Sequence, residues 1–587
     1  MPVRGRRGPI GGTGRGGSME RNEELWIRLA RGFPLVSRPA SRGARLAEAG
    51  LLAAQLGFLV WTRLLQPTVY SDDAYIHFEN ARHLARGEGL VFNVGQYVLA
   101  TTSPVYAVLL GLLHAATRIE LPSLATIVNF AADAGLLLLT LGWLKRAEVP
   151  LLFRHAALLI LSSEVLRMFY SVAGMEMSLF LLISLTVCDG LGRGSWLAPG
   201  ALLGALGWVR PEGVVVWGAA GLALAVERRW RQARRLFAVA LATAALLAGA
   251  LMLQYGTLIP QSLRAKAEAP WFREAGGLAP VEFFIRLGDL TPFYPLHGFR
   301  ASWGRMADQI NSSAVAGAQI VLMAVGAAYL GRRGLRGTAS FLAAFAIGYY
   351  LFYALANPQI FPWYYIPHFF ASLLLGAMGW WSCLETLLRR LKPLGRAGPL
   401  LARTSYIVGT GVLLGLSIWT TSRPALLRTA FPERPGWRGL AFRFEPPPPT
   451  ERESRYADVA ELMNVWIGPR THWRVGLVEI GIFGYHFNGA VLDTFGLASP
   501  EALLAARPET AAGLDPDCRH LHPINVLVAL RPEFVLSHQR WIPITPPCFL
   551  SLYRELRLPS IGLRLFVRRN VAPEIDVPSE WWYDPPV

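Results

Sequence analysis

The sequence predicts a polytopic α-helical membrane protein with about eleven transmembrane helices, followed by a small C-terminal extracytoplasmic α/β domain. Of its 587 residues, 53% are hydrophobic and 17% are charged, whereas roughly 25% of residues are charged in an average soluble domain. The mean hydropathy is +0.33, and the apolar residues form long blocks. These observations argue against an ordinary soluble enzyme and against a disordered chain.

The distribution of positive charge supports the membrane interpretation. The chain has 57 Lys and Arg against 40 Asp and Glu, a formal net charge of +17. The basic residues gather in the first 45 positions and in short clusters between apolar blocks, as in cytoplasmic loops. A nucleic-acid-binding protein needs its basic residues on one surface, so no nucleic-acid partner is expected. Most of the basic residues are Arg rather than Lys, which suggests a GC-rich bacterial genome.

Arginine clusters at 228–235, 332–336 and 389–396 mark the cytoplasmic side. They place the N-terminus inside and the C-terminal domain outside, in a multi-pass protein of the bacterial inner membrane. The shorter apolar piece at 104–117 is then a re-entrant or interfacial helix. Eleven segments have a length and composition that suit membrane spans: 46–65, 122–144, 151–167, 174–190, 195–209, 211–227, 236–254, 312–330, 338–356, 362–388 and 403–422.

The chain divides into four regions by composition. The predicted regions are a disordered basic cytoplasmic tail (1–43), a transmembrane domain (44–425) with outer loops at 66–121 and 255–311, a Pro-rich linker (426–450) and an extracytoplasmic α/β domain (451–587).

The C-terminal region has the pattern of short β-strands separated by helices or loops. Strands are expected within 473–485, 490–497, 524–538 and 562–569. The region also contains Cys518 and Cys548. Outside the cytoplasm they would be able to form a disulfide, and two free thiols are the alternative.

Two adjacent acids follow the first predicted span. Asp72 and Asp73 begin the sequence DDAYIHFENARHLARGEG, in which aromatic and apolar residues recur at helical spacing, as in a helix that lies along the membrane surface. A carboxylate here is able to accept the proton of an attacking hydroxyl. Two alternatives are that the acids cap this helix or hold a magnesium or calcium ion.

Other polar and aromatic residues are predicted to meet this loop at the outer face. Arg and Lys side chains stabilise a departing phosphate, and aromatic rings hold sugars or a lipid tail. Arg210 has the alternative of a structural ion pair with Glu212, and the aromatic residues that of an interfacial belt. A further acid, Asp133, lies within the predicted span 122–144 and is expected to face the interior of the bundle. The candidates for binding the donor phosphate or sugar are Glu176, Arg210, Arg264, Lys266, Trp363, Tyr364 and His368.

The order and spacing of several motifs resemble a known family. The motifs are DDAYIHFENARHLARGEGLVFN with TTSPVY, then GMEMSLF, RPEG, YGTLIPQSLRAK and WYYIP, and in the C-terminal region RESRYADVAELM and VGLVEIGIFGYHFNGAVLDTFGLASP. Together they resemble glycosyltransferases of the GT-C superfamily, and within it the mycobacterial-type terminal arabinofuranosyltransferase family, over nearly the whole chain after about residue 45.

The resemblance implies a GT-C-like fold and a transferase that uses a polyprenyl-phosphate-linked sugar. Members of the family carry a catalytic Asp in the first outer loop, which corresponds here to Asp72 or Asp73. The resemblance implies that one of the two acts as general base and that the other orients the acceptor or helps to hold a divalent ion. The implied partners are that sugar donor, a cell-envelope glycan acceptor and membrane lipids.

The sequence departs from the family where the substrates are expected. It has FNVGQYVLATTSP where the family often has FNPGE followed by an acidic stretch, and IPQS where the family usually has LPNT. The sugar and acceptor are therefore not carried over from the arabinofuranosyltransferases. Two other functions are alternatives: a lipid or sugar transporter, and a non-catalytic envelope or motility assembly factor on the same fold.

Overall fold

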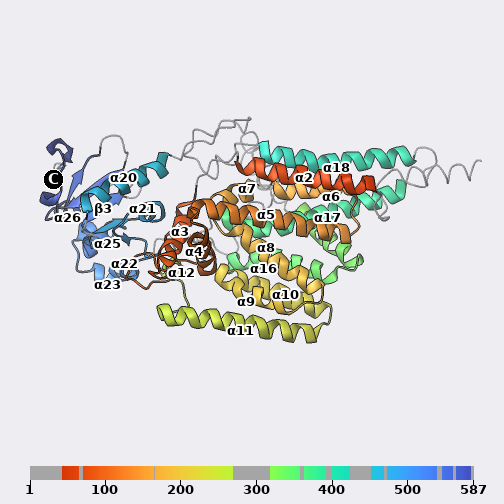
Figure 1. Ribbon diagram of the computed structural model, residues 1–587, viewed down its shortest axis with the longest axis horizontal. Coiled ribbons are helices and arrows are strands. Elements are labelled where there is room, and N and C mark those ends of the chain that lie inside the picture. The colour runs from red at the N-terminus through yellow and green to blue at the C-terminus, as the bar shows by residue number, and fades with distance from the viewer. Residues whose placement is uncertain are drawn as a thin grey trace, which may run out of the picture.

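Long helices run side by side along the long axis of the molecule, and the C-terminal residues form a unit with a β-sheet at one end of this bundle (Figure 1). The computed structural model describes residues 42–64, 70–163, 165–268, 317–356, 362–391, 398–422, 451–468, 472–537, 542, 545–558 and 563–583. The predicted tail, the Pro-rich linker and most of the outer loop at 255–311 lie outside these residues.

Each of the eleven predicted spans overlaps a helix among the described residues, although several of these helices begin or end a few residues inside the predicted bounds. Among the described residues, three helices are long and apolar enough to cross a membrane by length and composition: α5, α11 and α17. Crossing by the other helices stays a prediction. The bundle consists of α2 (Arg42–Leu64), α5 (Leu121–Arg146), α6 (Leu151–Ser162), α7 (Val165–Val172), α8 (Met177–Gly192), α9 (Leu197–Val209), α10 (Gly213–Val226), α11 (Trp230–Tyr255), helical residues 317–332, α16 (Arg336–Ala356), α17 (Ile366–Leu391) and α18 (Gly398–Ser422).

One predicted span is wrong in detail. The helix expected over 151–167 ends at Ser162, and a separate short helix, α7, covers Val165–Val172. The hydroxyls of Ser162 and Ser163 donate to backbone carbonyls of the preceding turn, a side-chain interaction that competes with continued helix.

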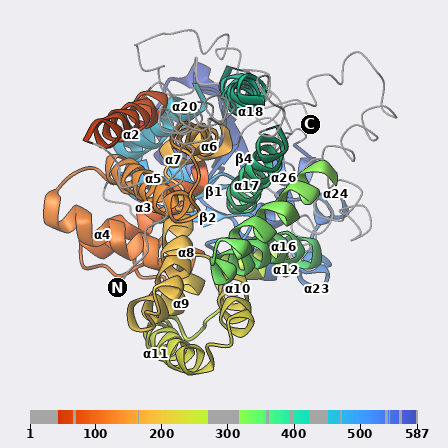
Figure 2. The same ribbon diagram turned by 90° about the vertical axis from the view of Figure 1, so that its right-hand side faces the viewer.

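The end of the bundle opposite the sheet faces the viewer in Figure 2. Ion pairs join the helix ends and connections there: Lys145 Nζ lies 3.0 Å from a carboxylate oxygen of Glu48, and Arg333 Nη2 lies 2.9 Å from Glu385. The sides of the bundle are apolar instead. On α11, for example, Leu253 is 92% exposed, which suits a helix facing lipid.

Three helices lie between the bundle and the sheet: α3 (Asp72–Ala85), α4 (Pro104–Thr117) and α12 (Gln261–Glu268) (Figure 1). The helix α4 is the piece that was predicted to be re-entrant or interfacial. It packs closely on α3 at Gly111, where an added Cβ would lie 2.9 Å from the carbonyl oxygen of Ala81.

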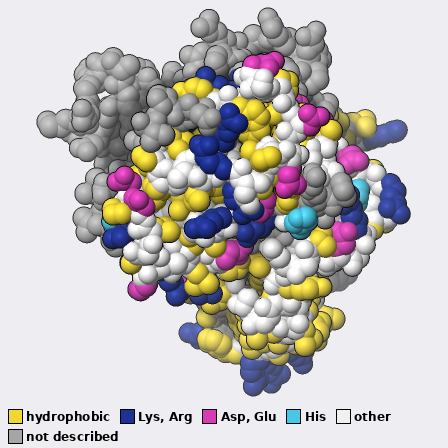
Figure 3. All heavy atoms as spheres, turned by 90° about the vertical axis from the view of Figure 1, so that its left-hand side faces the viewer, with side chains coloured by type: hydrophobic (Ala, Val, Ile, Leu, Met, Phe, Trp, Pro, Cys, Tyr) yellow, Lys and Arg dark blue, Asp and Glu magenta, His cyan; other side chains and the backbone are white. Residues whose placement is uncertain are grey.

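The C-terminal unit contains a six-stranded sheet in the order β2-β1-β3-β5-β4-β6. Strand β1 pairs parallel with β2 and β3, and the remaining pairs are antiparallel. Charged side chains of both signs are interspersed with apolar ones on its outer face (Figure 3). The strands are β1 (Arg474–Leu477), β2 (Ala490–Asp493), β3 (Phe534–Ser537), β4 (Tyr553–Leu556), β5 (Arg564–Arg568) and β6 (Trp582–Tyr583).

Parts of two predicted strand segments are helical. Residues Gly481–His486 form α21 and Ile524–Leu530 form α25, whereas β1, β2, β3 and β5 lie within the expected segments. Short apolar runs such as INVLVAL fit a buried helix and a buried strand equally well, because their periodicity does not separate the two.

The two cysteines of the C-terminal unit form a disulfide. Cys518 and Cys548 are bonded to each other, with their Cα atoms 6.2 Å apart. Of the two alternatives that the sequence left open, the structure therefore contains the bonded one.

Candidate active site

The start of α3 is held against the turn that precedes α8. The backbone N–H of Ser71 donates to the carbonyl of Ala173 at 2.9 Å. Gly174, which follows, has a φ of +81°, and an added Cβ there would lie 2.7 Å from the ring of Phe78. Glycine is the residue that tolerates both this conformation and this close approach. The motif GMEM therefore fixes where the first two residues of α3, Asp72 and Asp73, are placed.

The carboxylate of Asp72 binds the C-terminal unit. Its Oδ1 accepts the backbone N–H of Ile482 at 2.9 Å, and its Oδ2 accepts that of Gly481 at 3.1 Å. These two N–H groups open the short helix α21. Because both oxygens are engaged by backbone donors, Asp72 is the weaker candidate for a general base.

The next residue, Asp73, lies on a different face of α3 and is half-buried. Within the described residues its carboxylate accepts no hydrogen bond and makes no ion pair. It does interact electrostatically with Lys266 of α12. Asp73 is thus the acid of the pair whose carboxylate remains available for chemistry.

Lys266 of α12 carries the ammonium group that interacts electrostatically with this acid. Its Nζ donates to the phenolic oxygen of Tyr364 at 3.2 Å. Burial acts to lower the pKa of Lys266, but Tyr364 and Asp73 outweigh burial and raise the pKa above its usual value. Lys266 therefore stays charged at neutral pH.

The helix that carries Lys266 is tied to two other segments of the outer layer. At its first residue, Gln261, the backbone N–H donates to the carbonyl of Leu99 at 2.8 Å. The side-chain Nε2 of Gln261 donates to the carbonyl of Gly496, in the C-terminal unit, at 3.0 Å. The position of Lys266 thus depends on the first outer loop and on the C-terminal unit together.

Arg210 is the centre of a buried ionic network. Its Nε and Nη2 bind both carboxylate oxygens of Glu212 at 3.1 and 2.8 Å, and its Nη1 binds Glu176. The hydroxyl of Tyr353 also donates to Glu212. Glu176 is completely buried. The predicted pairing of Arg210 with Glu212 is confirmed, and the network joins α8, the α9–α10 turn and α16 rather than presenting Arg210 or Glu176 to a ligand.

His77 connects α3 to this network and was not predicted. Its Nδ1 lies 2.7 Å from the hydroxyl oxygen of Thr101, and its Nε2 lies 3.4 Å from Glu176. His77 follows Asp73 by four residues, so both occupy the same face of α3. That spacing is the signal by which the sequence could have identified it.

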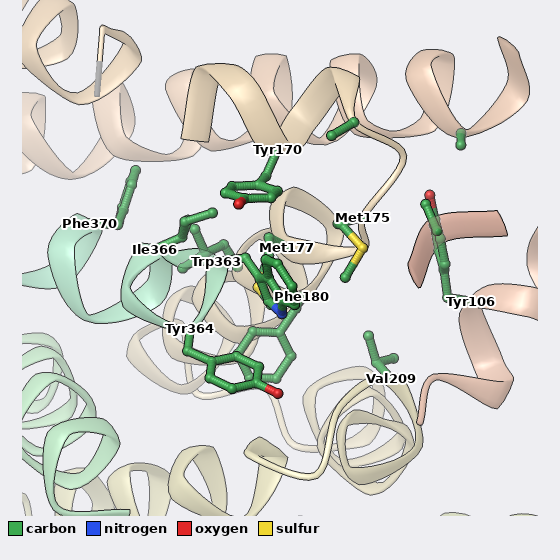
Figure 4. Packing of buried hydrophobic residues seen from close by; sticks show 14 of the residues in the cluster. Tyr106, Tyr170, Met175, Met177, Phe180, Val209, Trp363, Tyr364, Ile366 and Phe370 are labelled. Carbon is green, nitrogen blue, oxygen red and sulfur yellow. The ribbon is translucent and has the colours of Figure 1, made fainter. Parts of the chain in front are cut away.

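Aromatic side chains line the region next to Lys266. Tyr364 stacks on Tyr353, with ring centroids 4.7 Å apart, and Trp363 meets Tyr170 edge to face at 5.4 Å. Figure 4 shows Trp363 and Tyr364, from the 3-10 helix Pro362–Tyr365, among these apolar side chains. The predicted aromatics thus lie beside the charged groups.

Two predicted binding residues lie apart from this cluster. Arg264 is 50% exposed and pairs with Glu268 one turn along α12, at 2.8 Å. The Nδ1 of His368 lies 2.9 Å from the carbonyl oxygen of Ala346, which links α17 to α16. Their contacts fit structural or surface roles.

The acid expected inside the bundle has a buried cationic partner. Asp133 of α5 lies 3.7 Å from Arg167 of α7, and both side chains are at most 1% exposed. A buried charge of this kind requires such a partner, so this pair accounts for the acid without a transport role.

Polar residues of the C-terminal unit serve its own fold. Asp493 accepts backbone N–H groups of Phe495 and Ala498 at 2.9 and 2.7 Å. Burial raises the pKa of Asp493 to about 7 in spite of these bonds. Glu479 accepts the hydroxyl of Tyr456 at 3.1 Å.

A cation at Asp72 and Asp73 stays a prediction. Each oxygen of Asp72 accepts one backbone N–H group. Within the described part of the chain, no group of three or more His, Cys, Asp or Glu side chains is placed to hold a metal ion.

Neither the protein-family models nor the curated protein sequences contain a match to this chain. Among solved structures, the crystal structure of ArnT from Cupriavidus metallidurans bound to undecaprenyl phosphate is similar in fold. The alignment covers 92% of this chain and 100% of that chain, with 13% sequence identity and a TM-score of 0.46. At this TM-score the likeness carries no conclusion about the chemistry of this chain.

Proposed function

We propose that the protein is a membrane glycosyltransferase that transfers an arabinofuranose- or mannose-like sugar from a polyprenyl-phosphate donor to an extracytoplasmic cell-envelope glycan. The observation that carries the proposal is the hydrogen bond of the Lys266 ammonium group to Tyr364, together with its electrostatic interaction with Asp73, where the outer loops meet an apolar helical bundle. A carboxylate and an ammonium group at the edge of an apolar bundle suit an amphiphilic donor with an anionic head group. The resemblance of the outer-loop motifs to GT-C glycosyltransferases supports the same conclusion.

The proposed reaction is a single displacement at the anomeric carbon. The acceptor hydroxyl oxygen attacks this carbon and forms the new glycosidic bond, while its proton passes to the carboxylate of Asp73. The bond between the anomeric carbon and the phosphate oxygen breaks, and the polyprenyl phosphate leaves with the electron pair. Lys266 stabilises the negative charge of this leaving group.

The surrounding groups hold these two side chains in place. The buried network of Arg210, Glu176 and His77 supports the face of α3 that carries Asp73, and Tyr364, in the 3-10 helix before α17, supports Lys266. Correct placement matters because displacement of a catalytic group by about 1 Å can cost 10²-fold in rate.

The proposed orientation puts this site outside the cytoplasm. Loops rich in Arg remain on the cytoplasmic side of bacterial membranes, and such loops lie at the end of the bundle away from the sheet (Figure 2). The disulfide between Cys518 and Cys548 in the sheet unit fits an oxidising compartment. Both observations favour an extracytoplasmic site.

The two other candidate functions have less support. A transporter needs polar groups along a path through the bundle, but the buried acid Asp133 is paired with Arg167. A non-catalytic assembly factor would use Asp72 and Asp73 only as structural residues. Asp72 has such a role, whereas Asp73 does not within the described residues.

Sugar transfer by the purified full-length protein in detergent tests the proposal. The protein would receive polyprenyl-phosphate arabinofuranose, mannose or glucose together with an envelope glycan acceptor. Glycan extended by one sugar and release of polyprenyl phosphate are expected with one donor. Movement of a labelled lipid across liposomes without any such product would instead indicate a transporter. Absence of sugar transfer and of lipid movement with every donor, from protein shown to be folded, would favour the assembly factor.

A further inference from the structure

The helix α3 has two functional faces. Asp72, Tyr75 and Arg82 recur at helical spacing and meet α21 of the C-terminal unit. Asp73 and His77 occupy the adjacent face, which meets Lys266 and Glu176. A movement of α3 relative to α21 therefore also moves Asp73.

Aromatic rings and an arginine strengthen the contact of α3 with α21. The rings of Tyr75 and Phe78 lie with centroids 5.3 and 6.3 Å from that of Tyr485. Arg82 donates to the backbone carbonyl of Tyr485 at 2.6 Å, and its guanidinium lies 4.9 Å from the ring centroid. The contact is thus an extended, well-packed interface.

A second contact fixes the loop that follows α3 to the sheet. The side chain of Asn93 donates to the carbonyl of Val491 and accepts its N–H, both at 2.9 Å, as a neighbouring strand would. Since β2 is at the edge of the sheet, this amide covers part of an otherwise unpaired edge.

The backbones approach most closely at Gly481. A Cβ added there would overlap the backbone carbonyl oxygen of Asp72. A side chain at position 481 would therefore push apart the start of α3 and the start of α21. The two hydrogen bonds of Asp72 occur at this same point.

We propose that Asp72 is a positioning residue through which the C-terminal α/β unit sets the place of Asp73, so that this unit is a working part of the active site. The inference rests on the proposed function and deepens it. The carboxylate of Asp72 binds the two N–H groups, α3 is thereby held against Gly481, and the adjacent residue, Asp73, interacts electrostatically with Lys266.

Four variants of the full-length protein separate this role from direct chemistry. Asp72→Ala removes the two hydrogen bonds, and Gly481→Ala disturbs the same contact while leaving every charged group unchanged. Asp73→Asn removes the proposed base. Gly513→Ala is the matched control, because this glycine is exposed and an added Cβ has its nearest neighbour at 3.8 Å.

Transfer rates over a range of pH give the decisive readout. Asp72→Ala and Gly481→Ala are each expected to lower kcat by about 10- to 100-fold, with the KM for the donor and the shape of the pH profile unchanged. The double variant is expected to be no slower than the more severe single variant, because both changes act on one contact. Asp73→Asn should lower kcat by about 10²- to 10⁴-fold, and Gly513→Ala should leave it unchanged.

Two results would overturn the inference. The first is full activity of Gly481→Ala together with an inactive Asp72→Ala, which would mean that Asp72 acts through its own chemistry. The second is full activity of both. Full activity of Asp73→Asn would instead contradict the proposed function itself. Should Gly481→Ala fail to fold, Asp72→Asn decides: it keeps the volume and one acceptor oxygen, and its rate should fall between those of the wild type and Asp72→Ala.

Discussion

The carboxylate of Asp72 accepts the backbone N–H of Ile482 at 2.9 Å, although 410 positions separate the two residues in the chain. This bond joins the first outer loop to the C-terminal unit. It also distinguishes the two adjacent acids, since the carboxylate of Asp72 binds backbone N–H groups whereas Asp73 interacts electrostatically with Lys266.

Lys266 and Arg264 provide a test of how the donor phosphate is bound. Lys266→Met is expected to lower kcat/KM for the donor by about 10- to 100-fold, because a charged hydrogen bond contributes about 1.5–3 kcal/mol. Arg264→Met should change kcat/KM by less than about threefold, since Arg264 is half exposed and paired with Glu268. Steady-state kinetics with varied donor measures both. Equal effects of the two variants would contradict this assignment.

The buried carboxyl of Glu79 predicts a pH dependence of stability. Burial raises the pKa of Glu79 from its ordinary value of 4.5 to about 7, against the opposing effect of Arg82. Between these values the folded state holds a proton that the unfolded state has released, so stability falls as the pH rises through this window. Glu79→Gln removes this loss and should be more stable than the wild type at pH 8, on the order of 2 kcal/mol.

Thermal unfolding in detergent between pH 5 and 8 measures the effect of Glu79. The Tm difference between Glu79→Gln and the wild type should grow with pH. Glu268→Gln is the control, because Glu268 is exposed and its substitution should give a difference that does not vary with pH. A constant difference for Glu79→Gln would contradict the predicted protonation.

The disulfide is expected to stabilise the C-terminal unit. Cys518 and Cys548 are 30 positions apart, and closing a loop of that length stabilises a fold by about 3–4 kcal/mol on chain-entropy grounds. The double Ser variant should therefore be cleaved faster by a protease within this unit. Cys383→Ser is the control, because Cys383 is an exposed free thiol. Equal cleavage of all three proteins would be the contrary result.

Labelling of single cysteines tests the proposed orientation. Gly513→Cys in the C-terminal unit and Arg234→Cys at the start of α11 are both exposed positions. In a Cys383→Ser background, a membrane-impermeant maleimide should label position 513 in intact cells, and position 234 only after the membrane is permeabilised. The reverse pattern would contradict an extracytoplasmic site.

Most helices of the bundle were predictable, because long apolar blocks separated by Arg clusters are a strong signal. The break after Ser162 was not, since it depends on two hydroxyls that bind the preceding turn. In the C-terminal unit, α21 and α25 were mistaken for strands. Both are short apolar runs, and only their tertiary packing decides between helix and strand.

The sequence predicted which segments form the candidate site, but not the role of each residue within it. The motifs brought Asp73, Lys266 and Tyr364 into one candidate set, as the structure does. Sequence alone did not distinguish Asp72 from Asp73, because the difference arises from backbone N–H groups about 400 residues away in the chain. The engagement of Arg210 by Glu176 was likewise hidden, since it depends on how three helix ends meet.

The most direct test of the central claim is the rate of sugar transfer by Asp73→Asn compared with the wild type and with Glu268→Gln, an exposed acid of the same outer layer. The account predicts transfer from one polyprenyl-phosphate sugar by the wild type and Glu268→Gln, and a loss of about 10²- to 10⁴-fold in kcat for folded Asp73→Asn. Undiminished transfer by Asp73→Asn would contradict the assignment of Asp73 as the base. Absence of transfer by the wild type with every donor would contradict the glycosyltransferase itself.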